Sequence, residues 1–77
     1  MLFRSNRIKE VFAEVLGVDP SRIGEEENFF LELGGSSLDY MTLILKMEQE
    51  FEIKITLKDT SYSTVKEFYN YIISKEN

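Results

Sequence analysis

The sequence predicts an all-α fold: a small four-helix bundle, made of three main helices plus one short helix, with a long loop between the first and second helices. Three segments, residues 5–16, 37–51 and 64 onward, repeat apolar residues at spacings of three and four. Residues 51–57 alternate apolar and polar side chains, but a lone strand has no partner to pair with. The 77 residues are 43% apolar and 30% charged, which is typical of one ordered globule. We therefore expect residues 1–77 to form a single domain.

The first helix is expected from Ser5 to Leu16, because its apolar residues form one stripe. Gly17 then provides a helix stop. The stripe contains Ile8, Val11, Phe12, Val15 and Leu16.

The loop that follows is expected to contain a short helical turn. Asp19 can cap this turn and Pro20 can open it, while Val18 and Ile23 are available to hold it to the core. The run at residues 25–27 is interpreted as solvated charge. An apolar cluster is then expected to anchor the loop: Phe29, Phe30, Leu31 and Leu33.

The second helix, over residues 37–51, carries two apolar stripes. With Leu38 placed at zero and about 100° per residue, the expected core stripe lies at about 140–240° and the second at about 300–360°. The core stripe is Tyr40, Leu43, Ile44, Met47 and Phe51, and the second stripe is Leu38, Met41 and Leu45, with Glu48 beside it. Either the loop residues Phe29, Phe30 or Leu33 cover the second stripe, or it is exposed and implies a partner.

The rest of the chain is expected to form an extended connector over residues 51–57, a short fourth helix near residues 58–62 and a final helix. Thr64 and Glu67 match a capping box at the start of that helix. Its inner stripe is Val65, Phe68, Tyr69 and Ile72. The predicted core of the bundle is Ile8, Val11, Phe12, Val15, Leu43, Ile44, Met47, Phe51, Phe68 and Ile72.

The stretch LGGSSL, residues 33–38, lies at the start of the second helix. Ser36 falls toward the core on the helical projection and is the better N-cap, whereas Ser37 faces outward next to Met41. A helix start favours an attached anion, and the preceding glycines allow close approach of another molecule. By itself, however, such a stretch is typical of a turn followed by a cap.

Composition excludes several classes of function. The chain has no cysteine and no histidine, so it has no disulfide, no thiolate metal site and no imidazole base, and we expect no metal site. The net charge is −5, and residues 10–77 hold fourteen acidic and six basic side chains, which disfavours nucleic acid. The acidity either keeps the protein soluble or matches a basic partner. No apolar run reaches the length of a membrane span, so a cytoplasmic protein is expected.

The stretch NFFLELGGSSLD, residues 28–39, resembles the attachment segment of the phosphopantetheine-dependent acyl and peptidyl carrier proteins. The family pattern Leu-Gly-Gly-x-Ser-Leu falls on residues 33–38, and the resemblance spans nearly the whole chain. It implies a 4'-phosphopantetheine arm, derived from coenzyme A, on Ser37, with Gly35, Ser36 and Leu38 beside it. The arm's thiol would carry acyl, aminoacyl or peptidyl groups as thioesters between enzymes of fatty acid, polyketide or nonribosomal peptide synthesis.

The resemblance also implies that partners contact the second helix just after the serine. These partners are a phosphopantetheinyl transferase, an acyl- or amino-acid-activating ligase and downstream synthase enzymes. We expect a monomer, and whether the chain acts alone or belongs to a larger synthase stays open. Thr42 and Lys46 depart from the acyl carriers of fatty acid synthesis, and the acyl and peptidyl branches both stay open. The implied partner surface is Leu38, Asp39, Met41, Thr42, Leu45 and Glu48.

Enzymatic alternatives have weaker support. A serine hydrolase would need a positioned base, and Asp39 replaces the second glycine of a Gly-x-Ser-x-Gly elbow. A P-loop would need Gly-Lys-Ser/Thr, which is absent. The stronger rival is an unmodified helical module that docks a partner through its second helix. We therefore expect a non-enzymatic carrier, with this module as the alternative.

Overall fold

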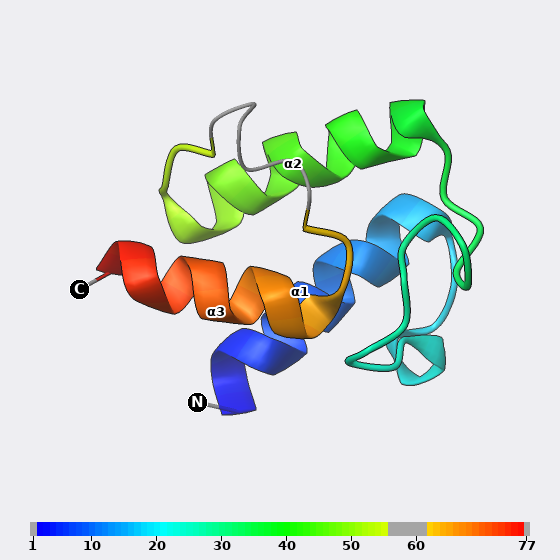
Figure 1. Cartoon of the computed structure of the whole chain (residues 1–77), viewed down its shortest axis with the longest axis horizontal. Helices are drawn as coiled ribbons and strands as arrows, with labels where there is room; N and C mark the ends of the chain where they lie inside the picture. Colours follow the sequence, from blue (N-terminus) through cyan, green and yellow to red (C-terminus); the bar gives the residue numbers. More distant parts are fainter. Residues whose placement is uncertain (1, 56–61, 77) are drawn as a thin grey trace.

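The structure is a computed structural model that describes residues 2–55 and 62–76. It contains three α-helices, α1 (Leu2–Leu16), α2 (Ser37–Phe51) and α3 (Val65–Glu76), and one 3-10 turn, η1 (Pro20–Arg22). α1 packs against both α2 and α3, and η1 lies against α1 (Figure 1). The described ranges contain no strand. The predicted all-α class and the bounds of α2 are therefore confirmed.

The ends of α1 follow from local sequence. The helix begins at Leu2, before the predicted start at Ser5, because no glycine or proline interrupts the preceding residues. It ends before Gly17, whose φ of 71° is left-handed. The Gly17 and Val18 amides both donate to the Ala13 carbonyl, at 2.8 and 3.1 Å. Glycine is suited to this position because it has no Cβ.

The core is rich in aromatic rings. The Phe12 ring centre lies 5.5 Å from that of Phe29 and 5.8 Å from that of Phe68, both in edge-to-face geometry. Seven predicted core residues are buried: Ile8, Val11, Phe12, Leu43, Met47, Phe68 and Ile72. Val15, Ile44 and Phe51 were also predicted to be core residues, which was wrong in the extent of burial. Their side chains are only partly buried, at the edge of the core. The core also contains Ala13, Ile23, Phe29, Tyr40, Ile55, Val65 and Tyr71.

The long loop, residues 17–36, begins with the predicted turn. The Asp19 carboxylate accepts from the Ser21 amide at 2.9 Å. Hydrogen bonds from the backbone and the side chain of Ser21 lower the pKa of Asp19. Ile23 is buried, as expected. The prediction for Val18 was wrong: its side chain is 40% exposed, beside a groove that Pro20 also lines, because the chain has already left α1 at Gly17.

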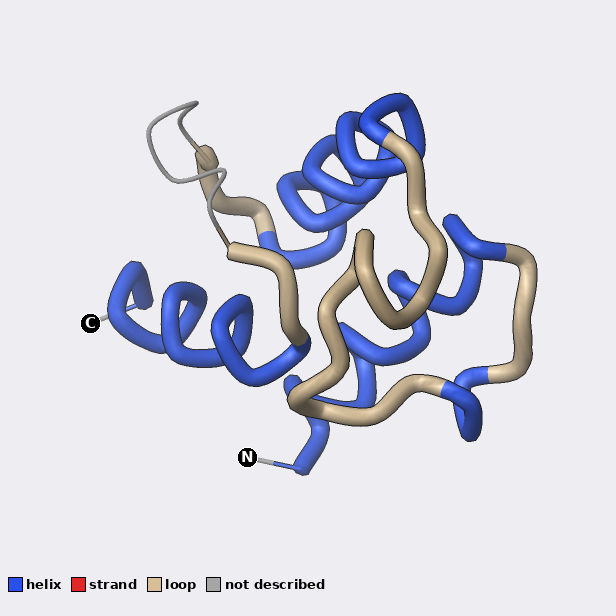
Figure 2. Tube along the Cα trace, turned by 45° about the vertical axis from the view of Figure 1, so that its right-hand side comes forward, coloured by secondary structure: helices blue, strands red, loops and turns tan. Residues whose placement is uncertain are grey.

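The loop then returns to α3, where two backbone hydrogen bonds hold it: Phe29 N–H to Ser63 O, 2.7 Å, and Lys66 N–H to Glu25 O, 3.0 Å. Figure 2 shows this course beside the start of α3. The predicted apolar cluster is partly wrong. Phe29 is buried and Leu33 partly so, but Phe30 is 38% exposed and Leu31 85% exposed, because the backbone turns outward here.

The segment between α2 and α3 lies partly outside the described residues. Ile53 and Ile55 pack onto the core without forming a strand, as expected of an extended connector. The predicted short helix at residues 58–62 lies outside the described residues, except for Tyr62. The predicted capping box is confirmed, because Thr64 Oγ accepts from the Glu67 amide at 3.1 Å and the Glu67 carboxylate from the Thr64 amide at 3.2 Å.

Candidate functional site

The start of α2 is fixed by a capping box. Ser36 is the N-cap, as predicted: its hydroxyl oxygen accepts from the Asp39 amide at 3.1 Å, and the Asp39 carboxylate accepts from the Ser36 amide at 3.0 Å. The role of Asp39 was missed, although Ser-x-x-Asp before an apolar run is a recognisable signal. The hydroxyl of Ser36 is thus engaged within the chain.

Ser37 is the first residue of α2, and its side chain is exposed. Within the described ranges, no hydrogen bond engages its hydroxyl. The amides of Ser37 and Leu38 precede the first helical hydrogen bond, from the Tyr40 amide to the Ser36 carbonyl at 2.9 Å. A phosphate on Ser37 would lie at the positive end of the helix, where an anion gains about 0.3 to 1 kcal/mol.

The two glycines before the serines are required for different reasons. Gly34 has a φ of 76°, where a side chain is strained, and a Cβ added there would meet nothing within 4 Å. At Gly35 an added Cβ would lie 2.2 Å from an atom of the Phe29 ring. The Gly35 amide also donates to the Phe29 carbonyl at 2.8 Å. Gly35 therefore admits a ring of this chain, whereas the sequence suggested room for another molecule.

The second stripe of α2 is exposed, so the interpretation that loop residues cover it was wrong. Leu38, Met41 and Leu45 are 75, 64 and 58% exposed. Phe29 is turned into the core instead. The buried side chains of the same helix are Tyr40, Leu43 and Met47. α2 thus has one apolar face in the core and another facing solvent.

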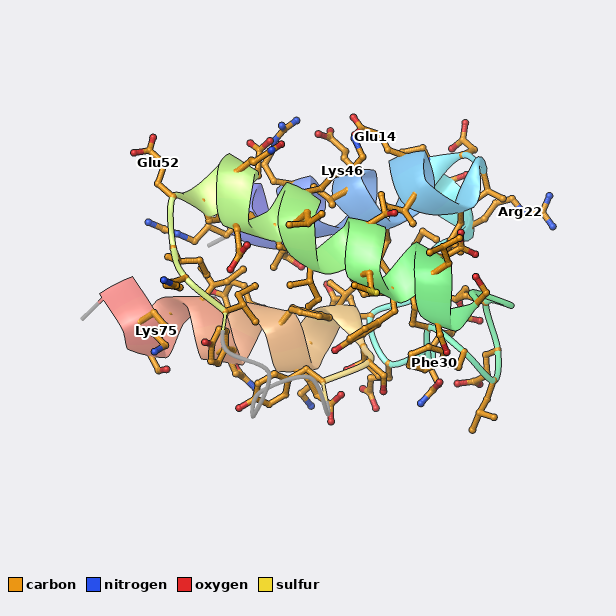
Figure 3. The ribbon with its side chains drawn as sticks, turned by 90° about the horizontal axis from the view of Figure 1, so that it is seen from above. Glu14, Arg22, Phe30, Lys46, Glu52 and Lys75 are labelled. Atoms are coloured by element: carbon orange, nitrogen blue, oxygen red, sulfur yellow. The ribbon has the colours of Figure 1, made fainter. Side chains whose placement is uncertain are left out.

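The polar residues near this stripe differ in their surroundings. The Thr42 hydroxyl donates back to the Leu38 carbonyl at 3.3 Å, and its side chain is exposed. The Glu48 carboxylate accepts from the Ile55 amide at 2.8 Å and so holds the connector, a role that the sequence did not reveal. The Lys46 ammonium lies 3.6 Å from the Glu14 carboxylate on α1 (Figure 3). Lys46 therefore points toward α1, away from the exposed stripe.

Tyr40 connects α2 to the chain before α3. Its hydroxyl donates to the Tyr62 carbonyl at 2.5 Å. Burial, with a smaller contribution from the charge of Glu67, raises the pKa of Tyr40 to about 12. The hydroxyl therefore stays protonated near neutral pH.

The described residues offer neither a metal site nor a membrane-spanning helix. In the described part of the chain, no group of three or more acidic, histidine or cysteine side chains is placed to hold a metal ion. None of the helices described has the length and apolar character that crossing a membrane requires. The start of α2 and its exposed stripe are therefore the strongest candidate for a functional site.

This fold and site define a helical protein with an exposed serine at a helix start. A family model described as the phosphopantetheine attachment site matches residues 6–72. The chain is also similar to an acyl carrier protein from Bdellovibrio bacteriovorus, with 36% identity over 70 residues that cover 90% of each chain. The chain belongs to the phosphopantetheine-dependent carrier protein family.

The resemblance found in the sequence is thereby confirmed. The chain is a carrier protein and not an enzyme, its prosthetic group is 4'-phosphopantetheine, and its role implies contact with a transferase and synthase enzymes. When bound, the group supplies the thiol that holds cargo as a thioester. The residues at the start of α2 fit this group, because an exposed hydroxyl stands where the helix stabilises a phosphate.

Proposed function

We propose that Ser37 carries the 4'-phosphopantetheine and that the chain shuttles acyl, aminoacyl or peptidyl groups between the enzymes of a biosynthetic pathway. The observation that carries the proposal is the contrast between the two serines. The Ser36 hydroxyl is held in the capping box, whereas the Ser37 hydroxyl is exposed and has no partner among the described residues. Of these two serines, Ser37 is the one whose hydroxyl can be esterified without loss of the cap of α2.

The chain positions the hydroxyl but does not activate it. The carboxylate nearest to Ser37 in sequence is that of Asp39, and it accepts a hydrogen bond from the Ser36 amide. The chain contains no histidine or cysteine that could act as a base near neutral pH. A separate transferase must therefore remove the proton of Ser37 and form the phosphoester. The role of this chain is to hold the hydroxyl outward on a rigid helix start.

The proposed partner surface is the exposed stripe of α2. Leu38, Met41 and Leu45 supply apolar area, and Asp39, Thr42 and Glu48 form its polar border. The proposed partners are a phosphopantetheinyl transferase, an acyl- or amino-acid-activating ligase and downstream synthase enzymes. Action as one carrier domain over residues 1–77, as a monomer and in the cytoplasm stays a prediction.

The attachment is tested by incubating the protein with coenzyme A and a broad-specificity phosphopantetheinyl transferase and recording its intact mass. We expect one adduct on the wild type, its retention in Ser36→Ala and its loss in Ser37→Ala. Ser36→Ala is the matched control, since it removes the neighbouring hydroxyl and costs about 1 kcal/mol of capping energy. An adduct on Ser37→Ala would place the attachment elsewhere.

The second candidate is an unmodified module that docks a partner through α2. It is favoured by one observation, because the exposed stripe would bind a partner whether or not Ser37 is esterified. The same mass measurement distinguishes the two functions. If the wild type gains no adduct under conditions that fully modify an established carrier, the unmodified module becomes the better explanation.

A further inference from the structure

Leu31 is 85% exposed, more than any residue of the α2 stripe. Single exposed leucines are common on protein surfaces and need no function. Leu31 differs because hydrogen bonds to and from Asn28 fix the backbone that presents it. The loop between α1 and α2 thus exposes an apolar side chain at a defined position.

Asn28 organises the turn that holds Leu31. Its side-chain oxygen accepts from the amides of both Phe30 and Leu31, each at 2.9 Å. Its carbonyl accepts from the amides of Glu32 and Leu33, each at 3.0 Å. Its own amide donates to the Glu32 carboxylate at 2.7 Å. The backbone on both sides of Leu31 is therefore ordered before any partner binds, which lowers the entropy lost on binding.

A second set of contacts joins this turn to the rest of the fold. The side-chain amide of Asn28 donates to Ser63 Oγ at 2.9 Å, next to the start of α3. The Phe30 ring centre lies 5.1 Å from that of Tyr40, one turn after Ser37, and Phe30 appears beside the first half of α2 in Figure 3. Leu31 follows Phe30 directly. The turn therefore lies against the end of α2 that carries Ser37.

We propose that Leu31 is an anchor for the enzyme that esterifies Ser37 and that it enters an apolar pocket of that enzyme. This inference depends on the function proposed above. An enzyme that acts on the serine hydroxyl itself must approach the start of α2 closely and so cover the adjoining turn. Enzymes that act on the thiol at the far end of a long arm are under no such constraint. The transferase is therefore the partner that this position fits.

The charges around Leu31 indicate which side chains should surround the pocket of the enzyme. Residues 23–45, which contain both the turn and the start of α2, hold five acidic side chains and no lysine or arginine. Glu25 is paired with Lys9 of α1 at 3.8 Å, which leaves four carboxylates without an ion pair among the described residues. Glu32 is adjacent to Leu31 in sequence and is exposed. The complementary surface is an apolar pocket with lysine and arginine side chains at its rim. Leu31 supplies the apolar contact and the surrounding carboxylates orient the encounter.

The test uses the full-length apo protein, coenzyme A and a broad-specificity phosphopantetheinyl transferase. Leu31→Ala removes most of the apolar contact, so the KM for the carrier should rise about tenfold while kcat changes by less than about twofold. The Kd of carrier and transferase, measured without coenzyme A, should rise by a similar factor. Leu31→Met is the matched control, because it keeps apolar volume and should leave KM within about twofold of the wild type.

The melting temperature of both variants should equal that of the wild type, because an exposed side chain contributes little to folding. If the wild type is modified on Ser37 and Leu31→Ala keeps the wild-type KM and Kd, the anchor is refuted and the attachment proposal survives. A fall in kcat at constant KM, or a large fall in melting temperature, also refutes the anchor. If the wild type is not modified at all, both proposals fail together.

Discussion

Individual residues of this protein show which parts of a site a sequence can reveal. The stretch LGGSSL indicated an N-cap at Ser36 and an outward Ser37, since both follow from helical geometry within a few residues. The reason for Gly35 could not be predicted in the same way. It depends on the Phe29 ring, six residues earlier, which occupies the place of a side chain at this position. A contact formed by a loop folding back has no periodic signal in the sequence.

Tyr40 provides a prediction at this scale, because burial raises the pKa of Tyr40 from its usual value to about 12. Below about pH 10 the hydroxyl is protonated in both the folded and unfolded chains. Between about pH 10 and 12 the unfolded chain loses this proton first, so the free energy of unfolding falls as pH rises, by about 1.4 kcal/mol at pH 11. In Tyr40→Phe, this contribution to the fall in the free energy of unfolding should be absent.

The measurement is urea unfolding of both proteins at pH 8 and pH 11. At pH 8 we expect Tyr40→Phe to be less stable by about 1 kcal/mol, because it loses the hydrogen bond to the Tyr62 carbonyl. At pH 11 the difference should be close to zero. All other side chains are the same in the two proteins, so their contributions cancel in the comparison. An equal difference at the two pH values would contradict the raised pKa of Tyr40.

Among the elements, α2 was predicted with the correct bounds, and its two stripes were separated by the sequence alone. The sequence could not decide whether the second stripe was covered, because that depends on where the loop places Phe29, Phe30 and Leu33. The loop itself was the least predictable part. The Leu31 amide donates to the Asn28 side-chain oxygen, and this turn leaves the apolar side chain of Leu31 exposed.

The opposite faces of α2 allow a matched pair of substitutions, because Met41 is 64% exposed and Met47 is buried. Met41→Ala should change the free energy of unfolding by less than about 0.5 kcal/mol, whereas Met47→Ala should cost about 2 to 5 kcal/mol. Met41→Glu should weaken binding to a partner enzyme and leave the melting temperature nearly unchanged. Urea unfolding and a binding titration check both statements. A large loss of stability in Met41→Ala would place this residue in the core.

For the whole molecule, the distribution of charge matters more than its sum. The chain has a net charge of −5, and several of its cations are paired within the fold. Arg7 on α1 pairs with Glu10 and Glu50, and Lys46 pairs with Glu14. These ion pairs lie between or along α1 and α2, and Lys9 on α1 also pairs with Glu25 at 3.8 Å. The other acidic side chains of residues 23–45, Glu26, Glu27, Glu32 and Asp39, form no ion pair with the described residues, and this segment holds no lysine or arginine. The start of α2 therefore lies within a negative region that a basic partner can recognise.

Such a region steers diffusional encounter, and salt screens it. The association rate constant with a phosphopantetheinyl transferase should therefore fall as salt rises from about 50 to 500 mM, with a smaller effect on dissociation. Stopped-flow binding measures both rates. Glu26→Gln removes one exposed charge from this region and should reduce the salt dependence, whereas Glu52→Gln, beyond the far end of α2, should change it less. An association rate that does not vary with salt would show that shape alone, without charge, guides the encounter.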